Sequence, residues 1–252
     1  MSATLKDIAK KVGIHPATVS RALNPRTAHL VNPATVVKVK KAAAALNYLP
    51  NPMAAGLRTS RSHTIGVVIP DLNNPLFPGM VRGIQDTLGR AGYTPLLVNT
   101  DNDADIESHL IASLSARRVD GFILATARRD HPLLAQLSEK FPIVLINRVS
   151  ESVQLPSVAA DEQHGIRLAI EHLYGLGHRE IAHVAGPAWS STGHERSQAF
   201  TRSMKDHGLV TAKRISAVSS WSIEAANECA SRLIKADPAI TAIVAANDQL
   251  AL

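Results

Sequence analysis

The sequence predicts a small all-α unit of the helix-turn-helix type, followed by a larger α/β core of two lobes that each contain a parallel sheet. Apolar residues recur at helical spacing around glycine and proline residues near the N-terminus. From Thr64 onward, short continuous apolar runs alternate with helical stretches, as in sheets that helices cover on both faces. The chain has 252 residues, which is enough for one small module and one larger domain.

The first fifty residues contain the start and stop signals of three helices. Thr4 can cap a helix, and Asp7 three residues later supplies the acidic partner of a capping box. Gly13 predicts the left-handed turn that ends this helix. A second helix is expected over Pro16–Leu23, because proline fits the first helical position, and a third begins at Asn32-Pro33. Two short helices around a glycine turn predict a helix-turn-helix, whose second helix fits the major groove of DNA.

Positive charge is concentrated in the same region. Residues 1–62 hold ten Lys and Arg against the single acidic Asp7, whereas the remaining chain holds 17 basic and 20 acidic residues. A strongly basic module on a mildly acidic body fits a polyanion partner. A solvated surface with a chance charge bias is the weaker interpretation.

Compartment and membrane signals agree with a nucleic-acid partner. Cys229 is the only cysteine, so no intrachain disulfide can form and a reducing compartment is expected. The sequence contains no secretory leader and no apolar run of about 18 residues. We therefore expect a cytoplasmic protein that does not contact a membrane.

The segment after the third helix reads YLPNPMAAGLRTSR, from Tyr48 to Arg61. It has room for one or two helical turns between Pro52 and Leu57, too short to be stable alone in water. Leu57 is an apolar residue among basic neighbours, a composition typical of a side chain that wedges into a minor-groove base step. An ordinary interdomain linker explains this composition equally well.

The core is expected to contain seven main strands and to change lobe near Val149–Ala160, where a short SVAAD strand lies. The expected strands are 65–70, 95–100, 121–126, 142–148, 181–186, 215–220 and 242–248. Ligands of such folds bind beyond the carboxyl ends of the strands. The polar groups that follow these ends, which could bond vicinal hydroxyls, are Asp71, Asn74, Asn147, Arg148, Arg196, Asn247 and Asp248.

Two aromatic residues complete this predicted effector site. Phe77 and Trp221 offer flat apolar faces for a sugar ring or a base. A turn, cap or packing role is the alternative for each residue alone. Their common position at strand ends favours a small-molecule site for a sugar-like or nucleoside-like effector.

The sequence contains no set of residues at the spacing that a known catalytic or metal site requires. The 11 histidines form no HExxH pair, and the sequence lacks a P-loop, G-x-S-x-G and G-x-G-x-x-G. Asp101, Asp103, Asp105 and Glu107 suggest an acidic helix start rather than a calcium loop. No catalytic residue, metal or cofactor is therefore expected. A transport-type sugar-binding protein and a sugar- or nucleotide-processing enzyme are the rival interpretations.

The segments TLKDIAKKVGIHPATVSRALN, LNYLPNPMAAGLR, DLNNPLF, VLINR, HVAGP and VAAND resemble those of the LacI family of bacterial transcriptional regulators. The resemblance runs from Thr4 to Leu252. It implies a periplasmic-binding-protein-like core and a repressor that binds an effector between its lobes. It also implies a homodimer that reads the two half-sites of a pseudo-palindromic operator in double-stranded DNA.

The resemblance also assigns residues and domains. The implied domains are a DNA-binding domain at 1–49, a hinge helix and linker at 50–63 and an effector-binding core at 64–252. Its lobes are expected at about 64–156 and about 157–252. Leu57 matches the leucine that the paired hinge helices insert into the operator. The residues expected to contact DNA are Leu5, Pro16, Ala17, Thr18, Ser20, Arg21, Asn24, Asn51, Leu57 and Arg58.

Four features depart from the family pattern. His15 replaces the usual serine cap, so we expect the second helix to start through Pro16 or a charged imidazole near phosphate. Gly56 weakens the hinge helix by about 1 kcal/mol relative to alanine, and Asn147 replaces an aspartate. Family members continue beyond NDQLAL, where this sequence stops, so both lobes are expected to be incomplete.

Overall fold

The computed structural model describes residues 3–24, 27–48, 61–211 and 213–252. Asn51, Leu57, Arg58 and the rest of the expected hinge helix lie outside the described residues. The chain forms two compact units, Met1–Ser60 and Arg61–Leu252. No described helix is long and apolar enough to cross a membrane.

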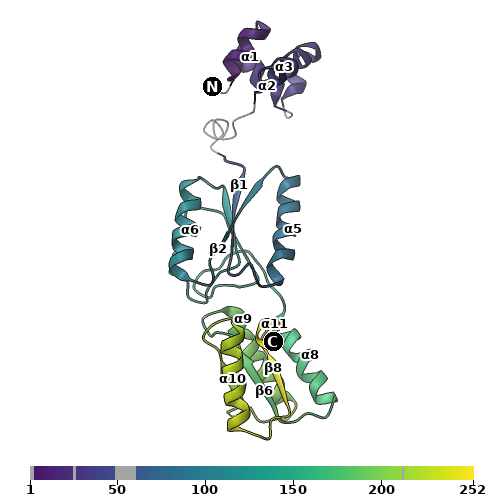
Figure 1. Ribbon diagram of the computed structural model, residues 1–252, viewed down its shortest axis with the longest axis vertical. Helices are drawn as coiled ribbons and strands as arrows, with labels where there is room; N and C mark the ends of the chain where they lie inside the picture. The colour runs from purple at the N-terminus through teal and green to yellow at the C-terminus, as the bar shows by residue number, and fades with distance from the viewer. Residues whose placement is uncertain (1–2, 25–26, 49–60, 212) are drawn as a thin grey trace. The chain divides into compact units, whose positions relative to one another are not determined.

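The first unit is helical, as predicted (Figure 1). Its elements are α1 (Leu5–Val12), α2 (Pro16–Leu23), the 3-10 turn η1 (Ala28–Leu30) and α3 (Pro33–Ala45). Thr4 and Asp7 form the predicted capping box, and Gly13 ends α1 with a φ of 73°. The helix-turn-helix therefore begins and ends at the residues that the local sequence signals indicate.

A miniature core holds the three helices together. Ile8, Val19 and Val39 contribute one fully buried side chain from each helix, and small alanines fill the space between them. Leu5 packs against this core and is partly buried. Because α2 buries Val19 and Ala22, its other face, with Ala17 and Arg21, is exposed.

The first lobe of the second unit is a parallel sheet with strand order β2-β1-β3-β4-β5. Its strands are β1 (Thr64–Ile69), β2 (Thr94–Asn99), β3 (Gly121–Leu124), β4 (Ile143–Ile146) and β5 (Ser157–Val158). Helices α5 (Leu76–Arg90) and α6 (Ala104–Ala116) flank the sheet on opposite sides (Figure 1), followed by the short α7 (Pro132–Ser138). The central strands β1 and β3 are largely apolar and buried because helices cover both faces of the sheet.

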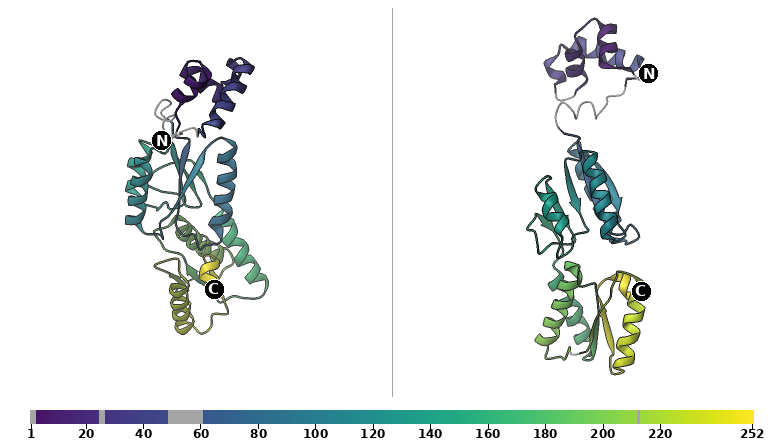
Figure 2. Two further views of the ribbon diagram at one scale, coloured as in Figure 1. Left: turned by 45° about the horizontal axis from the view of Figure 1, so that its top comes forward. Right: turned by 90° about the vertical axis from the view of Figure 1, so that its left-hand side faces the viewer.

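The second lobe repeats this design on a smaller parallel sheet of order β7-β6-β8. Its strands are β6 (Ile181–Ala185), β7 (Ile215–Ala217) and β8 (Ala242–Ala245). Its helices are α8 (Glu162–Gly175), α9 (Ser191–Asp206), α10 (Ile223–Ala236) and α11 (Asp248–Ala251). Figure 2 shows helices on both sides of this sheet, and all five residues of β6 are buried between them.

The seven predicted strands all form, and the SVAAD segment also forms a short strand, β5. Leu145 pairs with Ser157, so the short SVAAD strand is the last strand of the first sheet. The chain enters the second lobe only after Val158, and α8 begins at Glu162. The hydrophobic pattern located the strand, but it contained no information about which sheet the strand joins.

Candidate functional site

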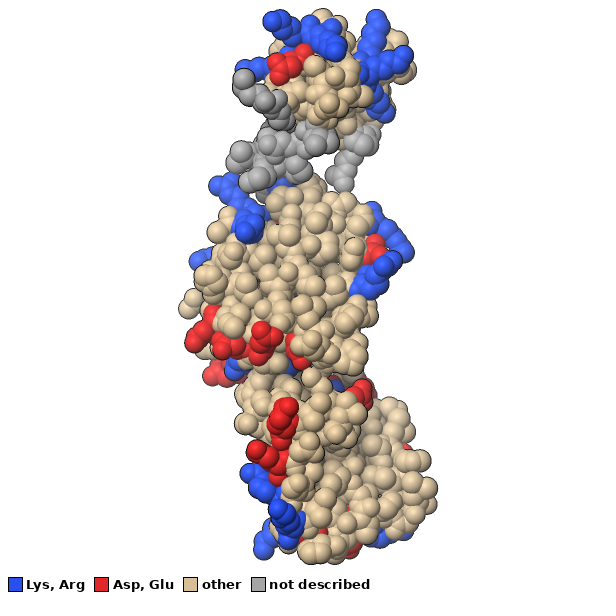
Figure 3. All heavy atoms as spheres, in the orientation of Figure 1, with Lys and Arg blue, Asp and Glu red and all other residues tan. Residues whose placement is uncertain are grey.

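The exposed surface of the first unit is basic. Figure 3 shows many Lys and Arg side chains on the small helical unit, whose described residues include Asp7 as their one acidic residue. Its exposed cations within the described ranges are Lys6, Lys10, Lys11, Arg21, Lys38, Lys40 and Lys41. Arg21 belongs to α2, the helix predicted to read DNA, and Pro16, Thr18 and Ser20 beside it are half-buried. This surface can offer both phosphate contacts and a guanidinium for a base edge.

His15 caps α2 through its side chain. Its Nδ1 accepts a hydrogen bond from the backbone N–H of Ala17 at 3.2 Å. Pro16 occupies the first helical position, so the histidine cap and the proline together start α2.

A cavity of about 680 Å³ lies at the carboxyl ends of the strands in the second unit. All nine residues predicted to bind an effector line it: Asp71, Asn74, Phe77, Asn147, Arg148, Arg196, Trp221, Asn247 and Asp248. They come from both lobes, as expected for parallel sheets whose strand ends face a common space. The structure therefore brings the predicted residues together in one cavity. They differ from one another in burial and in their hydrogen-bond partners.

Arg148 is placed by the turn that follows β4. Asn147 adopts a φ of +64°, and the backbone N–H of Arg148 bonds the Ile146 carbonyl at 2.7 Å. The guanidinium is 4% exposed, and its Nη2 donates to Oδ1 of Asn102 at 2.9 Å. Asn147 thus serves as a tight turn, and Asn102, which the sequence did not single out, orients Arg148.

Trp189 stacks on two arginines beside this turn. The guanidinium carbons of Arg128 and Arg148 lie 4.7 and 5.1 Å from the centroid of its ring. Arg128 also donates to the carbonyl of Asn102 at 3.0 Å. Burial, with further repulsion from Arg128 and Arg196, lowers the pKa of Arg148 to about 10.

Arg196 is already paired by a residue that the sequence did not identify. Its Nε and Nη2 donate to both carboxylate oxygens of Glu162, the Nη2–Oε1 distance being 2.9 Å, and Nη1 donates to the Ala246 carbonyl at 2.6 Å. Both side chains are largely buried. A ligand in the cavity therefore meets a neutralised Arg196 that ties α9 to α8 and to the end of β8.

A buried carboxylate lies beneath the arginines. Asp103 caps α6 and Glu107 lies in its first turn, as the acidic helix start predicted, and the Glu107 side chain points inward and is 2% exposed. Its carboxylate accepts from the Thr126 hydroxyl and lies 3.7 Å from Nε2 of His131. Burial raises the pKa of Glu107, and it lowers the pKa of His131 to about 4.

The two predicted aromatic faces differ in their availability. Phe77 is 2% exposed and packs among Val67, Ile69 and Ala125, so its ring belongs mainly to the core of the first lobe. Trp221 is only half-buried, and its Nε1 has no hydrogen-bond partner within the described part of the chain. Of the two rings, Trp221 is the one that offers a surface to a ligand.

Gly186 gives this indole its position. A Cβ at Gly186 would overlap the Trp221 ring, with Cζ2 and Cζ3 at 2.9 Å. We expect Gly186→Ala to displace the indole and to lower the free energy of unfolding by about 1–3 kcal/mol, measured by urea unfolding and near-UV circular dichroism. Gly165→Ala is the matched control, because Gly165 lines the cavity and has open space at its Cβ position. An unchanged Trp221 signal in Gly186→Ala would contradict the packing role.

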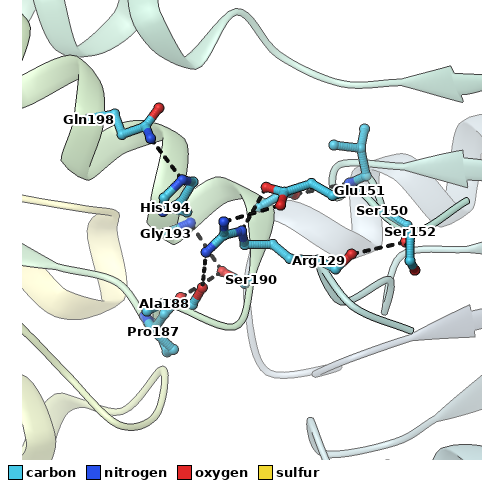
Figure 4. Close-up of polar contacts among 12 residues, drawn as sticks. Arg129, Ser150, Glu151, Ser152, Pro187, Ala188, Ser190, Gly193, His194 and Gln198 are labelled. Carbon is cyan, nitrogen blue, oxygen red and sulfur yellow. Dashed lines mark hydrogen bonds and ion pairs between the residues drawn. The ribbon is translucent and has the colours of Figure 1, made fainter. Parts of the chain in front are cut away.

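Two sets of contacts join the lobes around the cavity. Arg129 forms a bidentate ion pair with Glu151 and donates a hydrogen bond from Nη1 to the Ala188 carbonyl at 3.2 Å (Figure 4). Across the cavity, Gln249 accepts from Asn74 at 3.1 Å and donates to Asp71 at 3.2 Å. Neither Gln249 nor Arg129 had been identified from the sequence, because each acts through a partner far away in the chain.

Comparisons with known proteins match both units. The family model described as "Bacterial regulatory proteins, lacI family" matches residues 4–51, and that of the "periplasmic binding proteins and sugar binding domain of LacI family" matches 62–252. The Escherichia coli K12 repressor CytR is 31% identical over 100% of this chain and 73% of its own. The ribose operon repressor of Bacillus subtilis is 33% identical over 98% of this chain and 73% of its own.

Solved structures agree with the family models. The lac repressor dimer bound to operator and the anti-inducer ONPF superimposes with a TM-score of 0.84 at 27% identity, covering 100% of this chain and 76% of its own. The cellobiose complex of the regulator CelR gives 0.66 at 28% identity, over 98% and 75%. These matches confirm the predicted fold class. The chain therefore belongs to the LacI family of bacterial regulatory proteins, as a DNA-binding transcriptional regulator with an effector-binding core.

Proposed function

We propose that this chain represses transcription by reading an operator with α2, under the control of a small hydroxylated effector bound in the cavity between the lobes. The observation that carries the DNA-binding half is the exposed Arg21 on α2, within a unit whose described acidic side chains are limited to Asp7. The proposal divides the chain into a DNA-binding domain at 1–49, a hinge and linker at 50–63 and a core at 64–252. We place the protein in the cytoplasm, with its operator.

Each proposed DNA contact has a distinct chemistry. Arg21 can bond the O6 and N7 atoms of a guanine, whereas Pro16 and Ala17 can only offer apolar contact, for instance to a thymine methyl. Thr18, Ser20 and Asn24 would hold phosphates or the helix register, and Leu5 would lie beside them. The contacts proposed for Asn51, Leu57 and Arg58 lie outside the described residues.

The effector half of the proposal rests on the convergence of polar groups in one cavity. Asn147, Asn247 and Asp248 can bond neighbouring hydroxyls, and Trp221 can cover a ring. In a homodimer, ligand binding would change the angle between the lobes and so bias the folding of the hinges on DNA. Such coupling is reciprocal, so operator must change effector affinity by the same factor.

The test of this function is fluorescence anisotropy of the full chain with labelled duplexes of mixed sequence at two salt concentrations. Binding should weaken at least about tenfold between roughly 50 and 200 mM salt, because phosphate contacts release counterions. The sugar-transport and enzyme interpretations predict no duplex binding. Absence of binding, or binding that is insensitive to salt, would therefore refute the regulator function.

Arg21→Ala tests direct reading of the operator. We expect operator affinity to fall about tenfold to a hundredfold, since one bidentate arginine–guanine contact discriminates by about 1–3 kcal/mol. Affinity for unrelated duplexes should fall far less. Lys41→Ala, at another exposed cation on α3, is the control and should weaken both classes of duplex equally. Equal losses on both duplexes in Arg21→Ala would exclude a base contact.

A further inference from the structure

The most buried arginine of the cavity has no carboxylate bonded to it. Arg148 is 4% exposed and lines the cavity, and its Nη2 donates a hydrogen bond to the Asn102 amide oxygen. Its Nε is buried and has no hydrogen-bond partner among the residues that the structure describes. A guanidinium removed from water is costly unless an anion and further hydrogen bonds compensate it.

Other arginines of this core are compensated in that way. Arg196 is bonded to Glu162, Arg129 to Glu151, and Arg214 to both Glu180 and Asp237. These pairs supply the charge-assisted bonds that carboxylates form with guanidinium. Arg148, although more buried than Arg129, instead bonds a neutral amide and faces an indole.

The surroundings of Arg148 contain charges of both signs, but no carboxylate is bonded to its guanidinium among the described residues. Arg128 stacks on the same Trp189 ring, and its guanidinium bonds the Asn102 carbonyl, so two cations share one amide residue and one indole. Glu107 interacts with both arginines through space, but its carboxylate is buried and bonded to Thr126. The neighbourhood therefore lacks a directly bonded counter-charge for Arg148.

Two acidic residues of the cavity, Asp71 and Asp248, form no ion pair with Arg148. Asp71 accepts hydrogen bonds from Gln249 at 3.2 Å and from the backbone N–H of Asn73 at 2.8 Å. Asp248 opens α11 and lines the same cavity. Such carboxylates accept hydrogen bonds from hydroxyl groups, so the cavity lining offers both acceptors for hydroxyls and the guanidinium of Arg148.

We propose that the effector of this chain is a polyhydroxylated molecule carrying an oxyanion, a phosphate or a carboxylate, and that Arg148 binds this group. The proposal rests on the effector function proposed above and names the ligand class. The oxyanion accepts hydrogen bonds from the guanidinium N–H groups that have no partner in the described chain, such as that of Nε. The positive charge of Arg128 attracts the same anion. Hydroxyls of the same molecule bond Asp71 and Asp248.

The experiment compares matched probes that differ in charge. The full chain is titrated with glucose, glucose 6-phosphate and glucuronate, with ribose and ribose 5-phosphate, and with adenosine and AMP. Binding is followed by the fluorescence of Trp189 and Trp221, the only two tryptophans in the chain, and by calorimetry. A charged probe should bind at least about tenfold more tightly than its neutral counterpart. The preferred charged probe distinguishes phosphate from carboxylate.

Inorganic phosphate serves as a probe of the oxyanion site alone. At equal ionic strength, replacing chloride by phosphate should raise the Tm of the core by about 2–4 °C when phosphate is well above its Kd. Arg148→Met should abolish both this rise and the preference for charged probes. Arg167→Met, at an exposed arginine paired with Glu171 on α8, is the matched control and should retain both.

Two further variants keep the outcome decisive. Glu107→Gln removes a nearby negative charge but retains an acceptor for Thr126, so it should tighten charged probes, the opposite of Arg148→Met. If Arg148→Met does not fold, Arg148→Lys keeps the charge without the planar fork and should retain a weakened preference. The proposal is overturned if neutral probes bind as tightly as charged ones, or if neither phosphate nor any charged probe binds. It is also overturned if Arg148→Met keeps the preference. If duplex binding persists in those cases, the regulator function stands.

Discussion

Glu162→Gln is expected to lower the free energy of unfolding of the core by about 3–5 kcal/mol. The variant leaves the guanidinium of Arg196 largely buried without its carboxylate, and removal of one partner from a buried ion pair costs this much. The pair also fixes Arg196 on the Ala246 carbonyl, so the end of β8 should loosen as well. Urea unfolding followed by tryptophan fluorescence reports the core selectively, because both tryptophans, Trp189 and Trp221, lie in it.

Two controls separate the buried charge from a general effect of substitution. Glu171→Gln removes a carboxylate from an exposed pair with Arg167 on the same helix and should cost less than about 1 kcal/mol. The double variant Glu162→Gln with Arg196→Met should recover much of the loss, because no buried charge is left alone. A loss in Glu162→Gln as small as that of the exposed control would contradict this account.

Acid is expected to destabilise the core between about pH 6.5 and pH 4. Burial lowers the pKa of both His131 and His183 from 6.5 to about 4. His183 is fully buried on β6, stacked on Phe200, and its Nδ1 bonds the Val244 carbonyl at 2.8 Å while its Nε2 has no partner in the described chain. Protonation would place an N–H⁺ at that unpaired position.

The sign follows from proton uptake on unfolding. Between pH 4 and 6.5 the unfolded chain binds protons at these histidines and the folded chain does not, so stability is present above the unfolded pKa and falls as the pH falls. A shift of this size corresponds to about 3 kcal/mol for each histidine. Glu107 opposes the trend, because its raised pKa favours the folded state at low pH. We therefore expect a net loss smaller than the sum of the two histidine contributions.

Urea unfolding at pH 7.5, 6.0 and 5.0 measures this dependence. His183→Gln should flatten the profile by about half, although it lowers stability at pH 7.5. His109→Gln, at an exposed histidine on α6, should leave the profile unchanged. A wild-type profile without slope over this range would show that neither buried histidine takes up a proton on unfolding.

The predictions from sequence succeeded where the physical cause was local or topological. Thr4, Gly13 and Pro16 determine helix ends through their own backbone preferences, so α1 and α2 could be placed from neighbouring residues alone. The cavity-lining residues could be named because parallel strands end on one side of a sheet.

The predictions were incomplete where a side chain depends on a distant partner. The pairing of Arg196 with Glu162 spans 34 residues, and that of Asn74 with Gln249 spans 175. Nothing in the local pattern indicates that Phe77 turns into the core or that Glu107 points inward. The burial of such residues depends on how helices pack on the sheet, which periodicity leaves open.

The contact between Arg129 and the second lobe has a consequence for sequence drift. Arg129 meets the carbonyl of Ala188 through its side chain and the carbonyl of Trp189 through its backbone N–H (Figure 4 shows the first of these). Since every residue type presents the same carbonyl, position 188, which is exposed, can change freely without loss of this bond. These two bonds therefore place a requirement on the residue at position 129 and none on the side chain at position 188, whereas the neighbouring contacts of Trp189 with Arg128 and Arg148 depend on the indole itself.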